Sequence, residues 1–165
     1  MATVVTKLFN IVQPERAYLG QKDIQQTVVV KAMVRDLHIP LELRVCPTVR
    51  EPDGLALSSR NAYLESTQRN DALILWRSLK AGLELYSRQP LTSATAILNV
   101  ARDKMAQGVH DSNERASVDY LEIVHPETLD PLSGADLAKS GILVGAVFLR
   151  GNKRTIRLID NVILE

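Results

Sequence analysis

The chain has 165 residues, of which 45% are hydrophobic and 24% are charged, as in an ordinary soluble globular domain. The 20 Lys and Arg side chains nearly balance 19 Asp and Glu side chains, so the net charge of +1 does not favour binding to nucleic acid or to an anionic membrane. Aromatic residues make up 4%, too few for a base-stacking surface, and no apolar run reaches the roughly 18 residues of a membrane span. The single cysteine, Cys46, excludes an intramolecular disulfide, and we expect a cytoplasmic protein.

The first 50 residues predict a helix followed by a strand, a second helix and a second strand. Apolar residues at helical spacing over residues 5–12 predict a helix that ends before Pro14. Because this helix starts at Met1 without a capping residue, we expect a segment that packs against it to precede Met1. A strand over residues 16–20, a helix over 23–38 and a strand over 41–46 then predict a parallel, Rossmann-like βαβ unit.

The remaining residues predict a loop, two helices and three strands. Turn residues dominate 50–61, and helices follow over 67–86 and 93–107, the second closed by Gly108. Strands are predicted over the ranges 118–124, 142–149 and 155–159, the last two forming a hairpin. We therefore predict an α/β chain, with a partial Rossmann-like βαβ unit over residues 1–62 and a small α+β carboxyl-terminal domain with an antiparallel sheet over residues 63–165.

The first candidate site is the segment Gly20, Gln21, Lys22 and Asp23, which lies between a predicted strand and the start of a helix. Backbone N–H groups and the helix dipole favour a phosphate at such a position, and Lys22 adds a positive charge. The alternative is purely structural: Asp23 caps the helix, with Gln26 as its capping-box partner.

The second candidate is the loop segment Leu57, Ser58, Ser59 and Arg60. Its hydroxyl groups can bond phosphate oxygens, and the Arg60 guanidinium can bind two oxygens of a leaving pyrophosphate. The alternative is a Ser-rich turn that begins the next helix. We interpret Cys46 as a small buried hydrophobic residue.

Together these segments resemble the pantothenate synthetase (pantoate–β-alanine ligase) family. The resemblance rests on GQKDIQQ over residues 20–26 and PTVREPDGLALSSRN over residues 47–61, with TKLFNIVQP before them and TIRLIDNVILE at the end. It covers essentially the whole chain, but only the carboxyl-terminal portion of the family. It implies that pantoate attacks the α-phosphorus of ATP, pyrophosphate leaves, and β-alanine then displaces AMP to give pantothenate.

The resemblance also implies the roles of individual residues. Gly20, Gln21, Lys22 and Asp23 match the first ATP-binding motif, Gln26 matches a pantoate-binding glutamine, and Val49 matches a backbone contact to adenine. Leu57, Ser58, Ser59 and Arg60 match the second ATP motif; Lys22, Ser58, Ser59 and Arg60 are the implied catalytic residues. ATP with Mg²⁺ is the implied co-substrate, with no tightly bound cofactor, no protein metal site and no nucleic-acid or membrane partner. A homodimer is also implied.

One part of the family pattern has no counterpart in this sequence. The family's HxGH-type histidine motif and an upstream glutamine would precede Met1, so no residue of this chain takes the general-acid role. The resemblance leaves open whether the chain acts alone. Two alternatives stay open: a non-catalytic binding or dimerisation fragment, and a nucleotide-binding regulator.

Overall fold

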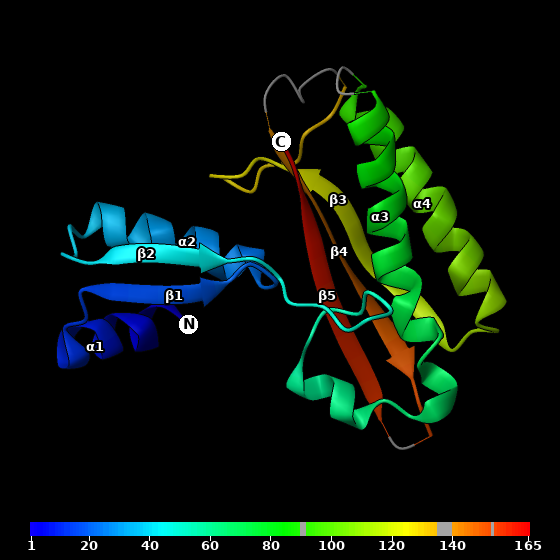
Figure 1. Cartoon of the computed structure of the whole chain (residues 1–165), viewed down its shortest axis with the longest axis horizontal. Helices are drawn as coiled ribbons and strands as arrows, with labels where there is room; N and C mark the ends of the chain where they lie inside the picture. The colour runs from blue at the N-terminus through cyan, green and yellow to red at the C-terminus, as the bar shows by residue number, and fades with distance from the viewer. Residues whose placement is uncertain (90–91, 135–139, 153) are drawn as a thin grey trace. The chain divides into compact units, whose positions relative to one another are not determined.

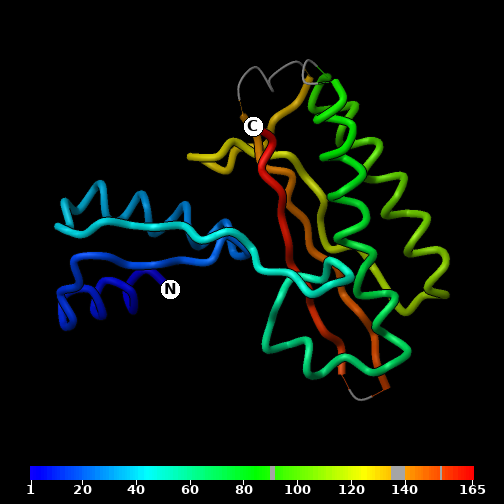
Figure 2. The backbone as a smooth tube through the Cα atoms, viewed as in Figure 1, coloured from blue at the N-terminus to red at the C-terminus, as the bar shows by residue number. Residues whose placement is uncertain are grey.

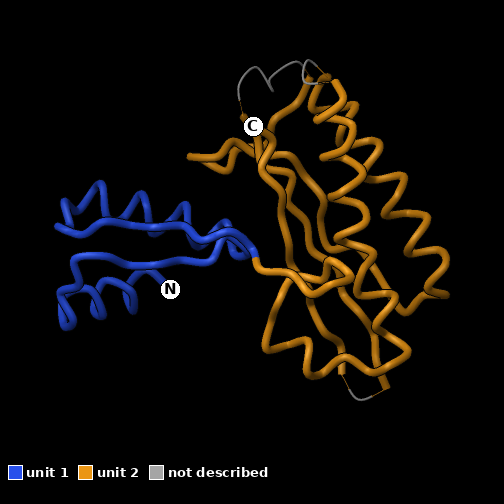
Figure 3. Tube along the Cα trace, in the orientation of Figure 1, with its two compact units in different colours: residues 1–48 blue, residues 49–165 orange. Residues whose placement is uncertain are grey.

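The computed structural model of the chain describes residues 1–89, 92–134, 140–152 and 154–165. These residues form two compact units, unit 1 (residues 1–48) and unit 2 (residues 49–165), which Figure 3 colours separately and Figure 2 traces as a continuous backbone. Each unit has its own sheet. Within the described ranges, no helix is both long and apolar enough to cross a membrane.

Unit 1 is a strand–helix–strand motif preceded by a helix (Figure 1). Its elements are α1 (Ala2–Val12), β1 (Arg16–Gly20), α2 (Ile24–Asp36) and β2 (Glu42–Cys46). The strands pair in parallel, with Gly20 opposite Cys46 at their carboxyl ends. Helix α1 contacts α2, where the Thr6 hydroxyl donates a hydrogen bond to the Met33 sulfur at 2.9 Å. The predicted parallel βαβ unit is confirmed.

Burial in unit 1 is confined to α2. The five buried residues of this unit all belong to that helix: Ile24, Thr27, Val28, Val30 and Met33. Helix α1 has no buried residue, although it is rich in apolar side chains. The interpretation of Cys46 as buried is wrong, because strand alternation places it on the same exposed face as Glu42 and Arg44.

Unit 2 is a three-stranded antiparallel sheet whose one face is covered by two helices (Figure 1). Its main elements are α3 (Ile74–Arg88), α4 (Ala94–Asp111), β3 (Ala116–Val124), β4 (Gly141–Arg150) and β5 (Thr155–Leu164). Strand β4 lies in the centre, and both of its neighbours pair with it along their length. Side chains such as Leu79, Ile97 and Leu143, which are fully buried, join the helices to the sheet in one apolar core. The predicted α/β class, with a parallel unit followed by a small antiparallel α+β unit, is confirmed.

The first predicted helix of unit 2 starts later than expected. The segment 59–73 contains three short 3-10 helices, η1 (Ser59–Tyr63), η2 (Ser66–Gln68) and η3 (Asp71–Leu73), and the α-helix starts only at Ile74. Side chains of this segment make their own hydrogen bonds: Gln68 accepts from the Glu65 N–H, and the Asp71 carboxylate pairs with Arg115 at 2.8 Å. These local and tertiary bonds compete with a continuous α-helical ladder.

Gly108 does not close the second helix, because α4 continues to Asp111. A Cβ at Gly108 would lie 2.9 Å from the Ile74 side chain, closer than real Cβ contacts allow. The glycine therefore permits close packing of α4 on α3 rather than a helix end. At the other end of α4 the Ser93 hydroxyl accepts a hydrogen bond from the Ala96 N–H at 3.2 Å, as expected of a cap.

Strand β5 is longer than the predicted range of 155–159. Asp160 and Asn161 interrupt the apolar pattern in the sequence, yet both side chains are buried within the strand. The Asp160 carboxylate is paired with the Arg50 guanidinium, which allows a charge to lie in the sheet. The hairpin of β4 and β5 has the expected antiparallel pairing, from Arg150 with Thr155 onward.

The boundary between the two compact units falls between Thr48 and Val49, whereas the sequence predicts a boundary at residue 62. Residues 49–62 belong with unit 2 because Leu55 and Ala56 are buried there and Arg50 pairs with β5. Sequence alone favours the first unit for this loop because the loop follows directly from the second strand of the βαβ motif.

Candidate functional site

The first candidate segment lies at the carboxyl ends of the two parallel strands of unit 1. Gly20 ends β1, the Gln21 N–H donates to the Cys46 carbonyl at 2.8 Å, and α2 begins at Ile24. No atom lies within 4 Å of a Cβ built on Gly20, so its backbone faces open space. The structure thus places this segment at the carboxyl ends of the strands and beside a helix N-terminus, an arrangement suited to an anion.

Asp23 is the N-cap of α2, and its carboxylate accepts a hydrogen bond from the Gln26 N–H at 3.3 Å. The helix cap predicted at Asp23 is therefore confirmed. The cap also fixes where Lys22 and the half-buried Gln26 lie, one before the helix and one in its first turn. A capping role and a role beside a ligand are compatible, because the cap uses one carboxylate oxygen.

The second candidate segment follows a closed turn in unit 2. Residues 49–57 fold back on themselves through hydrogen bonds from the Glu51 N–H to the Leu55 carbonyl, 2.8 Å, and from the Leu57 N–H to the Val49 carbonyl, 2.9 Å. Val49 and Leu57, distant by eight positions in the sequence, are therefore neighbours, and both side chains are exposed. The structure thus brings Val49, for which the family resemblance implies a backbone contact to adenine, beside the second candidate segment.

The side chains of the second motif differ in their roles. The Ser58 hydroxyl accepts a hydrogen bond from the Arg60 N–H at 3.2 Å and caps η1, as the structural alternative predicted. Ser59 and Arg60 are exposed. Among the residues that the structure describes, no carboxylate lies within ion-pair distance of the Arg60 guanidinium. The fold thus orders the backbone of this motif and leaves the hydroxyl of Ser59 and the guanidinium of Arg60 accessible.

Arg69, which follows the second candidate segment in the sequence, binds two acidic residues of the 49–57 turn. Arg69 bonds Glu51 at 2.7 Å and Asp53 at 2.5 Å. These hydrogen bonds lower the pKa of both carboxyl groups, helped at Glu51 by a hydrogen bond from Asn61. The same contacts raise the pKa of Arg69. The positive charge of Arg69 is therefore engaged within the loop, in contrast to that of Arg60.

The sequence did not reveal Arg50, Trp76 and Asp160 as a group that contacts this loop. The Arg50 guanidinium binds Asp160, 110 positions away, and lies 3.7 Å from the centre of the Trp76 ring. The one available signal was Asp160 itself, since a charge within an apolar strand requires a partner. No spacing rule identifies that partner.

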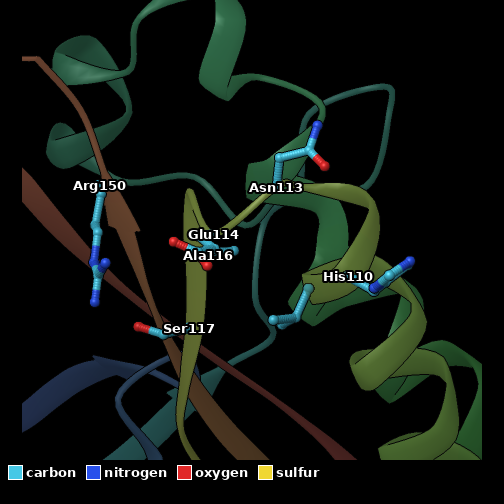
Figure 4. Close-up of a pocket in the computed structure, with 7 residues that line it drawn as sticks. His110, Asn113, Glu114, Ala116, Ser117 and Arg150 are labelled. Atoms are coloured by element: carbon cyan, nitrogen blue, oxygen red, sulfur yellow. The ribbon is translucent and has the colours of Figure 1, made fainter.

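A separate hollow in unit 2, of about 580 Å³, contains none of the residues predicted for the site. It lies where α4 ends and β3 begins, with Ser117 on β3 and Arg150 on β4 (Figure 4). Figure 4 shows the Arg150 and His110 side chains on opposite sides of Glu114 rather than pointing toward each other. Within the described part of the chain, no three His, Cys, Asp or Glu side chains converge as metal ligands.

Comparisons with known families, proteins and structures all match this chain to the same family. A family model described as pantoate-beta-alanine ligase matches residues 1–163. The pantothenate synthetase of Herpetosiphon aurantiacus is 46% identical over 164 residues, which cover 99% of this chain and 55% of that protein. The crystal structure of pantothenate synthetase from Thermus thermophilus matches with a TM-score of 0.81 and 45% identity, over 98% of this chain and 54% of that chain.

A second solved structure holds ligands. It is a pantoate-beta-alanine ligase from Francisella tularensis, complexed with beta-gamma ATP and beta-alanine, and it matches with a TM-score of 0.59 and 29% identity over 98% of this chain and 48% of that one. This chain therefore spans about half the length of the relatives that it matches.

Proposed function

The chain belongs to the pantoate-beta-alanine ligase family, and from this we propose that it carries part of the site that joins pantoate and β-alanine to form pantothenate. The pantoate carboxylate attacks the α-phosphorus of ATP and releases pyrophosphate, which gives a pantoyl-adenylate. The β-alanine amine then attacks the acyl carbon and AMP leaves. The observation that carries the proposal is that both ATP motifs occupy ordered, accessible segments, one in each unit.

The segment in unit 1 is proposed to bind ATP and pantoate. Gly20 and Asp23 lie near the ribose, Gln21 belongs to the same motif, and Lys22 contacts phosphate. Three features support this: the open space at Gly20, the helix N-terminus beside it, and the cationic side chain. Gln26, in the first turn of α2, is proposed to bind pantoate.

The segment in unit 2 is proposed to bind the base and the phosphates. The backbone of Val49 contacts adenine and that of Leu57 supports the loop, while Ser58 and Ser59 bond phosphate oxygens. Arg60 stabilises the charge that develops on the departing pyrophosphate, for which a planar guanidinium is well suited. ATP enters with Mg²⁺ as its co-substrate. We further propose a cytoplasmic homodimer that needs no nucleic acid or membrane.

The test is AMP release by the purified chain with ATP, Mg²⁺, pantoate and β-alanine, alone and mixed with the portion of the Thermus thermophilus protein that this chain does not match. In whichever sample is active, Lys22→Ala and Arg60→Ala should each lower kcat/KM by roughly 100-fold, because each removes a positioned charge. The matched controls are Lys31→Ala on α2 and Arg102→Ala on α4, both exposed, which should change it less than about twofold. Normal kinetics in Lys22→Ala and Arg60→Ala would exclude these residues from the mechanism.

The second candidate is a non-catalytic binding or dimerisation fragment. Helix α1 favours it, because it has no buried residue and exposes Leu8 by 51%, Ile11 by 78% and Val12 by 65%. A chain that releases no AMP in either sample and sediments as a dimer would support this candidate against the first.

A further inference from the structure

We propose that Arg50, Asp160 and Trp76 form a clamp that positions the loop carrying Ser58, Ser59 and Arg60 for ATP. The inference rests on the proposed function only in taking ATP as the ligand of that loop. The three clamp residues are positioning residues, and all of them lie in unit 2. They come from the start of the loop, from the last strand and from the first turn of α3, so the clamp joins segments far apart in the sequence.

The centre of the clamp is a two-pronged ion pair. The Arg50 guanidinium donates to both oxygens of Asp160, at 2.5 and 3.0 Å. The Asp160 side chain is 4% exposed and that of Arg50 is 20% exposed, so the pair is largely removed from water. Asp160 also accepts a hydrogen bond from the Asn161 N–H at 2.8 Å, which satisfies a further lone pair. Such a pair has a fixed geometry, because a guanidinium and a carboxylate match only in a common plane.

The second part of the clamp is the aromatic ring above the arginine. The Arg50 guanidinium lies 3.7 Å from the centre of the Trp76 ring, within cation–π range. It also donates to the Gly54 carbonyl at 3.1 Å. Gly54 has a φ of +96°, and a Cβ there would collide with the Trp76 indole. The turn at Gly54 therefore packs against the Trp76 ring that also contacts Arg50, and no residue with a Cβ can be accommodated at position 54.

The clamp is connected directly to the ATP loop by the backbone. Arg50 forms an isolated antiparallel bridge with Ala56, and Ala56 is 4% exposed. The next residue, Leu57, bonds back to Val49, and Ser58 follows. On the far side of the motif, the Asn61 amide donates to the Ala56 carbonyl at 3.1 Å and to Glu51 at 2.9 Å. The motif is thus held on one side by Ala56, which pairs with Arg50, and on the other by Asn61, which bonds Ala56 and Glu51.

Holding the motif in this way matters for ligand binding. Exposed loops lose conformational freedom when they bind, and a loop that is already ordered loses less. Ser59 and Arg60 are exposed and could sample many positions if their backbone were free. A misplacement of about 1 Å in a positioning segment costs up to roughly 100-fold in rate. We expect the clamp to act on ATP and to leave pantoate use nearly unchanged.

The test uses the full chain and the variant Arg50→Lys, which keeps the charge but removes the two-pronged fork. The control is Arg157→Lys, since Arg157, on β5, likewise pairs with an aspartate, Asp119, at 2.9 Å and lies over an aromatic ring, that of Tyr120. Amide hydrogen exchange is followed over residues 55–61 and over β4, with and without ATP and Mg²⁺. Exchange at β4 reports whether unit 2 is folded.

The proposal expects Arg50→Lys to speed amide exchange over residues 55–61 by about tenfold or more, while exchange at β4 is unchanged. In the same variant, the factor by which ATP slows exchange of this loop should fall by about tenfold. Arg157→Lys should resemble the wild type in both. If Arg50→Lys exchanges like the wild type, or exchanges faster but binds ATP equally well, the clamp does not position the loop. If β4 also exchanges faster in Arg50→Lys, the variant Asp160→Asn replaces it, because asparagine keeps the side-chain shape and one acceptor oxygen. Asp160→Asn is then judged by the same exchange and ATP-binding results.

The kinetic arm uses whichever sample releases AMP. Arg50→Lys should raise the KM for ATP about tenfold and leave the KM for pantoate within about twofold. A general loss of structure would instead lower kcat, whichever substrate is varied, and would overturn the proposal. Failure of the proposed function gives a different result, because a wild-type chain that neither binds ATP nor releases AMP would refute ATP as the ligand. The exchange rates without nucleotide would then still show whether the clamp orders the loop.

Discussion

Unit 1 and unit 2 both contain many apolar residues but bury them to very different extents. In unit 2 the apolar residues of α3, α4 and the three strands form one connected core, and nearly all of β4 is inaccessible to water. In unit 1 only α2 contributes buried residues, and both strands alternate between exposed and half-buried positions. Parallel strands are normally covered on both faces, so the exposed strands of unit 1 are unusual.

The contrast shows that a correct local pattern does not by itself give a buried core. The α1 sequence has helical periodicity and forms a helix, yet Leu8 remains 51% exposed, whereas Leu143 on β4 is fully buried. Hydrophobic stabilisation is proportional to the apolar area removed from water. We therefore expect the stability of this chain to come chiefly from unit 2.

Paired leucine substitutions test this contrast and give the largest expected effect on stability. Leu143→Ala removes a fully buried side chain at the centre of the sheet and should lower the free energy of unfolding by about 2–5 kcal/mol. Leu8→Ala should change it by no more than about 0.5 kcal/mol. Urea unfolding measures both. A cost above about 1 kcal/mol for Leu8→Ala would show that a second copy or another surface covers α1 in solution.

Two glycines extend the comparison to the candidate site. Gly54→Ala places a side chain at a φ of +96° and against Trp76, so it should destabilise unit 2 by about 1–3 kcal/mol. Gly20→Ala meets no atom within 4 Å and should leave the free energy of unfolding within about 0.5 kcal/mol. Thermal unfolding measures both variants. Equal effects would contradict the different environments that the structure gives these two turns.

The smallest expected effect is the acid sensitivity of the loop in unit 2. Arg69 holds the pKa of Glu51 and Asp53 below their ordinary values of 4.5 and 3.8. A carboxyl group with a lowered pKa in the folded state contributes stability above its unfolded pKa, and this contribution is lost as the pH falls through the folded pKa. The midpoint of thermal unfolding should therefore fall more steeply below about pH 4.5 in the wild type than in Arg69→Gln.

The control for this measurement is Lys80→Gln, which breaks an exposed pair with Glu84 at 3.8 Å on α3. Its profile should run parallel to that of the wild type, because exposed helix pairs contribute little. The wild-type and Arg69→Gln profiles should converge at low pH, where the carboxyl groups are protonated in both. Parallel profiles for these two proteins would show that Arg69 does not stabilise the loop through its charge.

Much of the fold followed from local patterns. The bounds of β1, the cap at Asp23, the parallel pairing and the antiparallel hairpin of β4 and β5 were all predictable, since each depends on residues near in sequence or on one short connection. Two other features were not predictable. The start of α3 follows a segment in which Asp71 pairs with the distant Arg115, and α4 continues past Gly108, which packs against Ile74 of α3.

The sequence by itself determined which residue types are present in the two segments proposed to bind ATP, and that each lies at a turn. Only the tertiary structure decided what holds the second motif, because Arg50 and Asp160 are 110 positions apart and meet only when β5 is in place. Local patterns report hydrogen bonds and periodicity within a few residues. The pairing of a buried charge depends on which distant group the folded chain brings within reach, and that requires the packed structure.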